Sequence, residues 1–349
     1  MRLASFDYEL PQELIAQFPL KKRDSARLLV LDRKKRRVEH RIFQDITDYV
    51  RQDELVVLND TRVLSSRLLG SRKTGGKVEV LLIRHKGNLT FRAMIKPTRV
   101  KLGEKIIFTP LETKSKQQRG ARSLTGFNRG KSYGTISARD EITFKLKDMD
   151  AVYDLGVMPL PPYIKRESVD LDRTYYQTVY ADQDGAIASP TAGLHFTREL
   201  LNKLESSGVN LGFITLHVGL GTFRPVKADD ITRHKMDSEY FRINGKVINK
   251  IDALRLKKKR IFAVGSTALR ALETYALTGV KEGYTDLFIY PGFKFNLVDC
   301  LLTNFHLPRT TLFMLVCAFA GEKLAKKAYR EAIEKKYRFY SYGDAMLIL

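Results

Sequence analysis

The chain has 349 residues, and its 61 Lys and Arg against 39 Asp and Glu give a formal net charge of +22 at pH 7. Its length suggests about two domains, and a hydrophobic fraction of 44% lets both bury a core, which excludes a chain disordered throughout. Because so large a basic excess destabilises a compact protein unless an anion neutralises it, nucleic acid is the leading candidate partner.

The N-terminal part combines a basic segment with predicted strands. Basic side chains dominate between Lys21 and Arg41. The cluster from Arg33 to Arg37 lies between the apolar LLVL and the segment VEHRIF, a pattern typical of a hairpin turn. The apolar run ELVVLND, which ends at Asp60, predicts a strand that joins an α/β sheet built by later residues.

Residues 62–144 show the pattern of an antiparallel β unit. Short runs rich in β-branched residues alternate with glycine-containing and charged turns. The runs are KVEVLLI, LTFRAMI, EKIIF, GTISA and EITFKL. They predict a small β-barrel. Within it, the basic segment Leu111 to Lys131 has few apolar residues and predicts a long loop.

From about Gly185 onward, predicted strands alternate with predicted helices. The strands are GAIAS, VNLGFITLHV, RIFAVGS and TDLFIYP, and the helices are TRELLNKLESSG, TALRALETYALTG and the long stretch that begins TLFMLVCAFAG. This alternation is typical of an α/β domain. We therefore predict a discontinuous α/β domain, residues 1–60 and 155–349, with an inserted antiparallel β-barrel domain, residues 61–154.

We expect neither a membrane protein nor a disulfide framework. No stretch reaches the roughly 18 uninterrupted apolar residues of a spanning helix, and the first residues lack the pattern of a secretory leader. A cytoplasmic location is therefore expected. Cys300 and Cys317 lie in apolar surroundings without ligand spacing, which is typical of buried, inert thiols.

The motif SPTAGLHF follows the predicted strand GAIAS. Pro190 and Gly193 favour a tight turn there, which leaves Thr191 and His195 near the carboxyl edge of the sheet. Imidazole suits acid–base chemistry because it titrates near neutral pH. Taken alone, however, His195 is more readily explained as a packed, hydrogen-bonded structural residue.

The motif TLHVGLGTFRP continues the predicted strand GFIT. Gly219 and Gly221 permit a ligand to approach the backbone closely, but the third glycine of a dinucleotide fingerprint is missing. A plain Rossmann site is therefore poorly supported. His217 lies on an alternating strand, and such a histidine is more often a core residue than a catalytic one.

Two further turns carry polar or aromatic residues. In AVGSTALRALE, Ser266 and Thr267 lie at a strand-to-helix junction whose free N–H groups favour a polar ligand, although a plain helix cap explains them equally well. Arg270 and Glu273 share one helix face and are spaced to pair with each other. The segments YPGF and TNFHLP place aromatic side chains beside glycine and proline, where they either stack on a base or fill a core.

The barrel region offers simple ion pairs, because Asp60 and Arg62, and likewise Lys77 and Glu79, point to the same face of a strand. The sequence contains no zinc-ligand spacing, no phosphate-binding Walker loop and no Gly-x-Ser-x-Gly elbow. We therefore expect no metal.

A series of motifs runs through the chain in order: FDYELPQELIAQFP, LVVLNDTRVLSSRL, GGKVEVLL, MPLPPYI, YQTVYA, SPTAGLHFT, TLHVGLGTFRPV, AVGSTALRALE, IYPGF, LTNFHLP and YRFYSYGDAML. Together they resemble the S-adenosylmethionine:tRNA ribosyltransferase-isomerase family of the queuosine pathway, from Phe6 to Leu347. The segment Leu111 to Lys131 carries none of these motifs, so no role is transferred to it.

The resemblance implies a concrete reaction. The ribosyl part of S-adenosylmethionine is transferred and isomerised onto the aminomethyl group of a 7-deazaguanine at the wobble position of tRNA, which gives epoxyqueuosine and releases adenine and methionine. S-adenosylmethionine is then a consumed co-substrate rather than a recycled cofactor, and no metal takes part. The resemblance also implies an α/β domain with an inserted β-barrel.

The reaction needs a base next to the sulfonium, an acid for the leaving adenine and a neutral attacking amine. On the resemblance, we expect His195, His217 and His306 to be catalytic or substrate-positioning residues. The residues expected to line the pocket for S-adenosylmethionine and the target base are Thr191, Gly193, Gly219, Gly221, Ser266 and Thr267. The candidates for contact with nucleic acid or with the methionine carboxylate are Arg62, Lys77 and Arg224.

The expected partner is the anticodon arm of a tRNA with the modified wobble base, bound by a monomer. We expect the Lys21 to Arg41 hairpin and the Lys114 to Lys131 loop to form parts of the tRNA surface, although each is also explained as a solvated charged loop. Two other classes remain open: a non-enzymatic RNA-binding protein, and a conventional S-adenosylmethionine-dependent RNA methyltransferase, which the missing glycine-rich turn disfavours.

Overall fold

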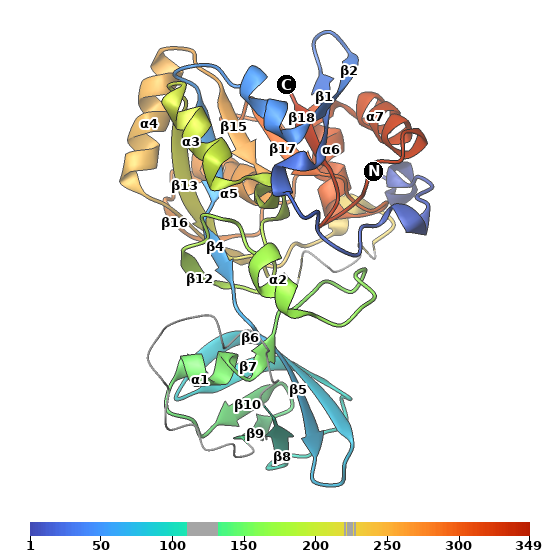
Figure 1. Cartoon of the computed structure of the whole chain (residues 1–349), viewed down its shortest axis with the longest axis vertical. Helices are drawn as coiled ribbons and strands as arrows, with labels where there is room; N and C mark the ends of the chain where they lie inside the picture. Colours follow the sequence, from blue (N-terminus) through green and yellow to red (C-terminus); the bar gives the residue numbers. More distant parts are fainter. Residues whose placement is uncertain (110–131, 220, 222–225, 227) are drawn as a thin grey trace. The chain divides into compact units, whose positions relative to one another are not determined.

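Two large sheets organise the described chain, and each lies in a compact unit of its own (Figure 1). A third, two-stranded sheet pairs β4 (Thr61–Val63) with β12 (Gln183–Ala186). The computed structural model describes residues 1–109, 132–219, 221, 226 and 228–349. The α/β unit consists of Met1–Arg62, Pro161–Arg166 and Gln177–Leu349, and the barrel unit consists of Val63–Leu160 and Glu167–Tyr176. The predicted fold class, an α/β fold interrupted by an antiparallel β-barrel, is confirmed. The residue borders drawn from the sequence stay a prediction.

Nine strands of the described chain form the sheet of the α/β unit. Their order is β16 (Glu282–Thr285), β14 (Glu239–Ile243), β13 (Asn210–Leu216), β3 (Leu55–Asn59), β15 (Ile261–Val264), β17 (Cys300–Asn304), β18 (Ala345–Ile348), β1 (Arg27–Asp32) and β2 (Arg37–Ile42). Strands β13, β3, β15 and β17 run parallel and form the middle of the sheet. The run ELVVLND thus supplies the central strand β3, and the Arg33 to Arg37 cluster turns the β1–β2 hairpin, both as predicted.

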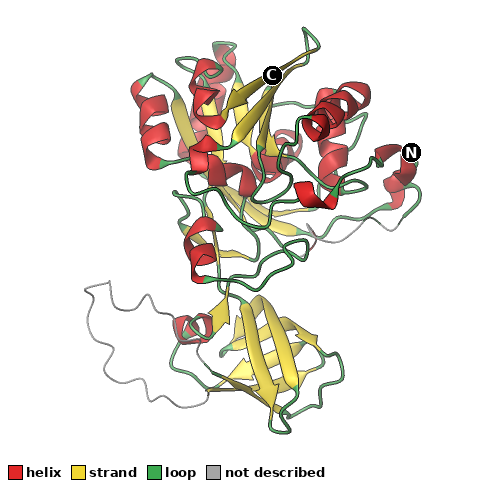
Figure 2. Ribbon diagram, turned by 45° about the vertical axis from the view of Figure 1, so that its right-hand side comes forward, coloured by secondary structure: helices red, strands yellow, loops and turns green. Residues whose placement is uncertain are grey.

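Both faces of this sheet are buried because successive side chains alternate between two hydrophobic clusters. In β3, Leu55 and Val57 belong to one cluster, whereas Val56 and Leu58 belong to the other. The first cluster is completed by the helices α4 (Gly245–Leu256), α5 (Gly265–Thr278), α6 (Thr311–Ala320) and α7 (Glu322–Glu334). The second is completed by α3 (Arg198–Ser206) and the short helix η4 (Phe43–Asp48), so that helices cover both faces (Figure 2).

Two predicted elements differ from the observed ones. The long helix expected after Thr311 is divided into α6 and α7 at Gly321, whose φ of 86° is a conformation that interrupts a right-handed helix. The strand expected at TDLFIYP instead ends at its first residue, Thr285. Residues 286–291 form no strand, and Leu287 and Phe288 pack against the first hydrophobic cluster instead.

Six strands close the barrel unit. Their order is β5 (Arg67–Arg72), β6 (Lys77–Gly87), β7 (Thr90–Lys96), β10 (Glu141–Phe144), β9 (Ser132–Ala138) and β8 (Lys105–Phe108), and β8 pairs back with β5. All these pairings are antiparallel, and inward-facing residues such as Leu68, Val80 and Phe91 fill the interior. The short elements β11 (Gly156–Val157), α1 (Met149–Tyr153) and α2 (Asp170–Tyr175) complete the unit. The predicted segment Leu111 to Lys131 lies outside the described residues.

The cysteines agree with the prediction, since Cys300 and Cys317 are buried and free, and burial raises the pKa of each thiol to about 12. Over the ranges that the structure describes, no helix has both the length and the apolar character needed to cross a membrane.

The expected pair between Arg270 and Glu273 on α5 is wrong. Arg270 instead forms a buried ion pair with Glu239 of β14, and its Nε donates to the Leu287 carbonyl at 3.0 Å. The fully buried carboxylate of Glu273 accepts hydrogen bonds from the main-chain N–H groups of residues 296, 297 and 298, at 2.8 to 3.0 Å. Arg270 and Glu273 therefore bind partners distant in the sequence rather than each other. Glu273 anchors the segment that leads into β17.

Replacing Glu273 with Ala should destabilise the protein, because the N–H groups of Leu297 and Val298 would stay buried without acceptors. We expect the free energy of unfolding in urea to fall by about 3 kcal/mol. Glu205→Ala, at an exposed position of α3, is the control and should change it by less than about 0.5 kcal/mol. Equal losses for the two variants would refute the anchoring role.

Candidate functional site

The motifs singled out in the sequence meet at one edge of the α/β sheet. Because β13, β3, β15 and β17 run parallel, their carboxyl ends share this edge, which is where ligands bind in open α/β sheets (Figure 1). Directly after these four strands come His217, Asp60, Gly265 and Phe305, respectively. We refer to the residues that follow the four strand ends, with the helix η6 (Thr191–His195), as the edge site.

Asn59 ties three of the strand ends together. Its side-chain amide nitrogen donates to the Leu216 carbonyl at 2.9 Å and to Thr267 Oγ1 at 3.1 Å. Its amide oxygen accepts from the main-chain N–H groups of Leu216, at 3.0 Å, and Thr61, at 3.2 Å. Asn59 is fully buried, so these four bonds fix the ends of β3 and β13 and the start of α5. Sequence reasoning missed it, although a polar residue ending an apolar strand was a visible signal.

Asn304, at the end of β17, connects the SPTAGLHF turn to the sheet. Its amide oxygen accepts from Thr191 Oγ1 at 3.2 Å, and its amide nitrogen lies 3.3 Å from His195 Nε2. The same nitrogen donates to the Tyr340 carbonyl at 3.0 Å. Thr191 and His195 therefore both contact Asn304, an asparagine that the SPTAGLHF motif did not reveal.

His195 is neutral in this arrangement. It is only 5% exposed and packs against the Phe43 ring at 4.9 Å between centroids. Burial, followed by the positive charges of Arg23 and Arg338, lowers the pKa of His195 to about 3. Since Asn304 donates to Nε2, the proton of the neutral ring lies on Nδ1. His195 thus orients neighbours rather than exchanging protons near neutral pH.

His306 is buried in the same manner. It is 6% exposed, its Nε2 lies 2.9 Å from Thr303 Oγ1, and burial lowers its pKa to about 3. Its main chain is held as well, because the N–H donates to Tyr329 Oη at 3.1 Å and the carbonyl accepts from Tyr8 Oη. These contacts are those of a residue that packs the end of β17.

His217 differs from the other two because it is half-buried. Its Nδ1 lies 2.7 Å from Thr61 Oγ1, and its ring stacks on Tyr240 with an interplanar angle of 22°. Burial and then Arg242 lower its pKa, whereas Asp184 opposes the shift. A Cβ at position 185 would lie 2.7 Å from His217 Nε2, so Gly185 is needed to leave room for the ring.

Asp60 is a carboxylate that sequence reasoning assigned to the wrong partner. The expected Asp60–Arg62 pair is absent from the described residues: Arg62 lies 3.4 Å from Asp184, and no Lys or Arg side chain forms an ion pair with Asp60. Instead, Asp60 accepts a hydrogen bond from Thr215 Oγ1 at 2.7 Å. Burial, the largest cause, raises the pKa of this half-buried carboxyl.

The predicted glycines lie where chain segments approach closely. A Cβ on Gly193 would come within 2.0 Å of Tyr180 Oη, and one on Gly221 would come within 2.8 Å of Asp237 Cβ. The Gly219 N–H donates to Glu239 Oε1 at 2.8 Å, which joins this turn to the buried Arg270–Glu239 ion pair. Packing within the protein therefore accounts for all three contacts.

The remaining predicted site residues lie in different parts of the chain. Ser266 is half-buried and Thr267 is buried, both in the first turn of α5. Lys77 is exposed and begins β6 of the barrel unit. Arg224 and the Lys114 to Lys131 loop lie outside the described residues. Among residues that are described, no group of three or more His, Cys, Asp or Glu is arranged to hold a metal ion.

The basic hairpin is partly used inside the protein. Arg33 donates to the main-chain carbonyls of Leu349, Phe319 and Asp299, and its guanidinium lies over the Phe319 ring. Arg27 lies over the Tyr337 ring, 3.7 Å from its centroid. Both arginines are therefore engaged within the protein. The exposed basic residues of the segment are those of the turn, residues 34–37, together with Lys21, Lys22 and Arg41.

Gly193→Ala should force Tyr180 out of place, because the new methyl group would overlap its hydroxyl. We expect the free energy of unfolding, measured in urea, to fall by about 2 kcal/mol. Tyr180 Oη has no hydrogen-bond partner among the described residues, so Tyr180→Phe alone should leave stability nearly unchanged. Adding Tyr180→Phe to Gly193→Ala should recover part of the lost free energy of unfolding. If the effects of the two substitutions on this free energy are strictly additive, the clash is refuted.

The two buried histidines should make stability depend on pH. Each is neutral when folded, with a pKa of about 3, but titrates near 6.5 when unfolded. The stabilisation is therefore complete above about pH 6.5 and is lost as the pH falls toward 3, at about 1.4 kcal/mol per pH unit for each histidine. Urea unfolding of His306→Gln between about pH 7 and pH 5 should show a correspondingly shallower slope. A slope equal to that of the unsubstituted protein would contradict a neutral His306.

Comparisons with known proteins identify the family of the chain. The family model described as "Queuosine biosynthesis protein" matches residues 3–348. A relative from Sulfurihydrogenibium sp. (strain YO3AOP1) is 48% identical over 357 residues, and one from Aquifex aeolicus is 47% identical over 349 residues; each match covers 100% of both chains. Both relatives carry the name S-adenosylmethionine:tRNA ribosyltransferase-isomerase.

A solved structure leads to the same family. The crystal structure of S-adenosylmethionine tRNA ribosyltransferase from Thermotoga maritima is similar, with a TM-score of 0.55 and 35% identity, covering 99% of this chain and 100% of that one. The resemblance drawn from the sequence motifs is thereby confirmed. This chain belongs to the queuosine biosynthesis protein family.

Proposed function

We propose that the chain is an S-adenosylmethionine:tRNA ribosyltransferase-isomerase. The observation that carries the proposal is its identity of 48% over full length with a relative of that name. In the proposed reaction, the ribosyl part of S-adenosylmethionine is transferred and isomerised onto the aminomethyl-deazaguanine at the wobble position of tRNA. Epoxyqueuosine forms in the tRNA, and adenine and methionine are released. S-adenosylmethionine is a consumed co-substrate, and the proposed tRNA substrate implies a cytoplasmic location.

Asp60 is the proposed proton acceptor. The reaction requires removal of a proton from the carbon next to the sulfonium, and a carboxylate without a cationic partner can both accept this proton and stabilise the cationic substrate. Among the described residues Asp60 forms no ion pair: its carboxylate accepts a hydrogen bond from Thr215, and Arg242 affects its pKa less than burial does. Its raised pKa makes it a stronger base than an exposed aspartate.

His217 is the proposed second titrating group, which protonates the departing adenine or keeps the attacking amine neutral. It is the half-buried member of the three expected histidines, and Thr61 connects it to the chain next to Asp60. We assign positioning roles to His195 and His306, since both are buried, neutral and hydrogen-bonded within the protein. The sequence led us to expect catalytic or positioning roles for all three histidines, and we now assign proton transfer to His217 alone.

The remaining predicted residues keep proposed binding roles. Thr191 and Ser266 are half-buried at the edge site and have hydroxyl groups that suit the ribose or the target base. The glycines at 193, 219 and 221, with Thr267, shape the backbone around them. Arg62 is assigned to the methionine carboxylate or the tRNA backbone, and Lys77 and the hairpin turn at residues 34–37 are assigned to the tRNA backbone.

One assay distinguishes the proposed enzyme from its alternatives. The full chain is mixed with S-adenosylmethionine and with tRNA carrying the aminomethyl-deazaguanine, and the small-molecule products are separated. Release of adenine and methionine is the expected result. A methyltransferase would release S-adenosylhomocysteine instead, and a non-enzymatic RNA-binding protein would release nothing, so either outcome would overturn the proposal.

Substitutions at the two proposed titrating groups should slow the chemistry itself. We expect Asp60→Asn and His217→Gln each to slow single-turnover adenine release by about 10²-fold or more, because each removes a proton-transfer group. Asp252→Asn, at an exposed position of α4, and His234→Gln, at a half-buried position whose pKa is also lowered, are the matched controls and should react at the unsubstituted rate. Single-turnover rates of Asp60→Asn or His217→Gln that equal their controls would eliminate that residue as a proton-transfer group.

A further inference from the structure

Strand β6 of the barrel unit changes character along its length. From Lys77 to Ile83, its side chains alternate between buried and more exposed positions, as in any strand with one face on a core. Three consecutive exposed residues follow, Arg84, His85 and Lys86. The pairing of β6 with β7 is irregular between Leu82 and Arg84 and again between His85 and Gly87. At these bulges Arg84, His85 and Lys86 are exposed in succession, with the ring of His85 on the same side of the strand as Phe91.

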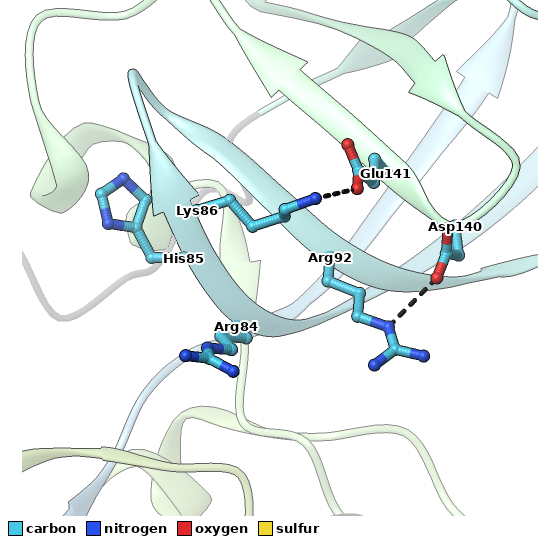
Figure 3. A pocket seen from close by; sticks show the side chains of 6 residues that line it. All are labelled: Arg84, His85, Lys86, Arg92, Asp140 and Glu141. Carbon is cyan, nitrogen blue, oxygen red and sulfur yellow. Dashed lines mark hydrogen bonds and ion pairs between the residues drawn. The ribbon is translucent and has the colours of Figure 1, made fainter.

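The side chains border a surface hollow of about 610 Å³. It is lined by Arg84, His85 and Lys86 of β6, Arg92 of β7, Asp140, and Glu141 of β10 (Figure 3). The lining is therefore built by three neighbouring parts of one antiparallel sheet, within a single unit of the fold.

Both carboxylates of the hollow are already engaged. Arg92 Nε donates to Asp140 at 3.0 Å, and the Lys86 ammonium forms an ion pair with Glu141, as Figure 3 shows. The side chain of Arg84 lies apart from both carboxylates, and in the described part of the chain its guanidinium forms no hydrogen bond or ion pair. The hollow therefore has one uncompensated guanidinium.

The position of Arg84 is unfavourable for the isolated barrel. It lies directly opposite Arg92 in the β6–β7 ladder, and like charges at such a position destabilise a sheet. His85 adds an exposed ring that packs on Phe91, with 5.2 Å between centroids. An anion placed between the two arginines would relieve the repulsion.

We propose that this hollow binds a backbone phosphate of the tRNA substrate, with Arg84 as the principal contact. The inference rests on the proposed function, which supplies a polyanion as the partner. Arginine is suited to the task because its planar guanidinium binds phosphate oxygens in pairs. The ion pairs with Asp140 and Glu141 hold Arg92 and Lys86 in place around the same space. The site positions the tRNA and reads no base, since phosphate contacts are independent of sequence.

The test is tRNA binding by Arg84→Ala over a series of salt concentrations. Loss of one phosphate contact should raise the Kd several-fold and reduce the slope of log K against log salt by about 1. Lys105→Ala removes an exposed charge from β8 of the same barrel, outside the hollow, and is the matched control. Arg84→Lys retains the charge and should keep most of the salt slope while losing the paired contact. Thermal unfolding of all variants checks that the barrel is intact.

Two results overturn the inference: a Kd and salt slope for Arg84→Ala equal to those of Lys105→Ala, or a loss explained by an unfolded barrel in both Arg84 variants. Adenine release by the unsubstituted chain is measured in parallel. If that chain is active while Arg84→Ala binds tRNA like the control, the phosphate site alone fails. If it releases no adenine while Arg84→Ala still binds tRNA weakly, the proposed reaction fails and the phosphate site stands.

Discussion

The edge site depends on one buried side chain, the amide of Asn59. An amide has two donor and two acceptor positions, and here its oxygen and nitrogen contact Leu216, Thr61 and Thr267. Unsatisfied, the same group would strongly destabilise the interior. The ends of β3 and β13 and the start of α5 must therefore come into register, and Asp60, Thr61 and His217 take their positions from that register.

Burial separates the three histidines into two kinds. An imidazole exchanges protons readily near neutral pH only if its protonated form is not strongly destabilised. Burial destabilises the protonated forms of His195 and His306 and so lowers the pKa of each. Both then become fixed hydrogen-bonding groups that hold Asn304 and Thr303. His217 keeps one side in contact with solvent and the other on Thr61. Residues of the same type at one edge of a sheet can thus have different chemistry because they are buried to different depths.

Local patterns predicted much of the fold, and long-range contacts decided the rest. Alternation and turn residues identified β3, the β1–β2 hairpin, α3, α5 and most barrel strands. The same patterns paired Arg270 with Glu273 and Asp60 with Arg62, because nothing local reveals Glu239 or Thr215 as the better partner. Within the edge site, the motifs pointed to the histidines, but Asn59, Asn304 and Asp60 acquire their importance only when distant strands meet.

Strand β18 lies between β17 and β1, although β1 begins at Arg27 and β18 ends at Ile348. During synthesis, the β1–β2 hairpin therefore emerges from the ribosome long before its partner strand exists. Until then the side of β1 that later pairs with β18 is an open apolar edge, and open edges of this kind can pair with wrong neighbours or bind chaperones. The sheet can therefore close between β17 and β1 only after β18 has been synthesised.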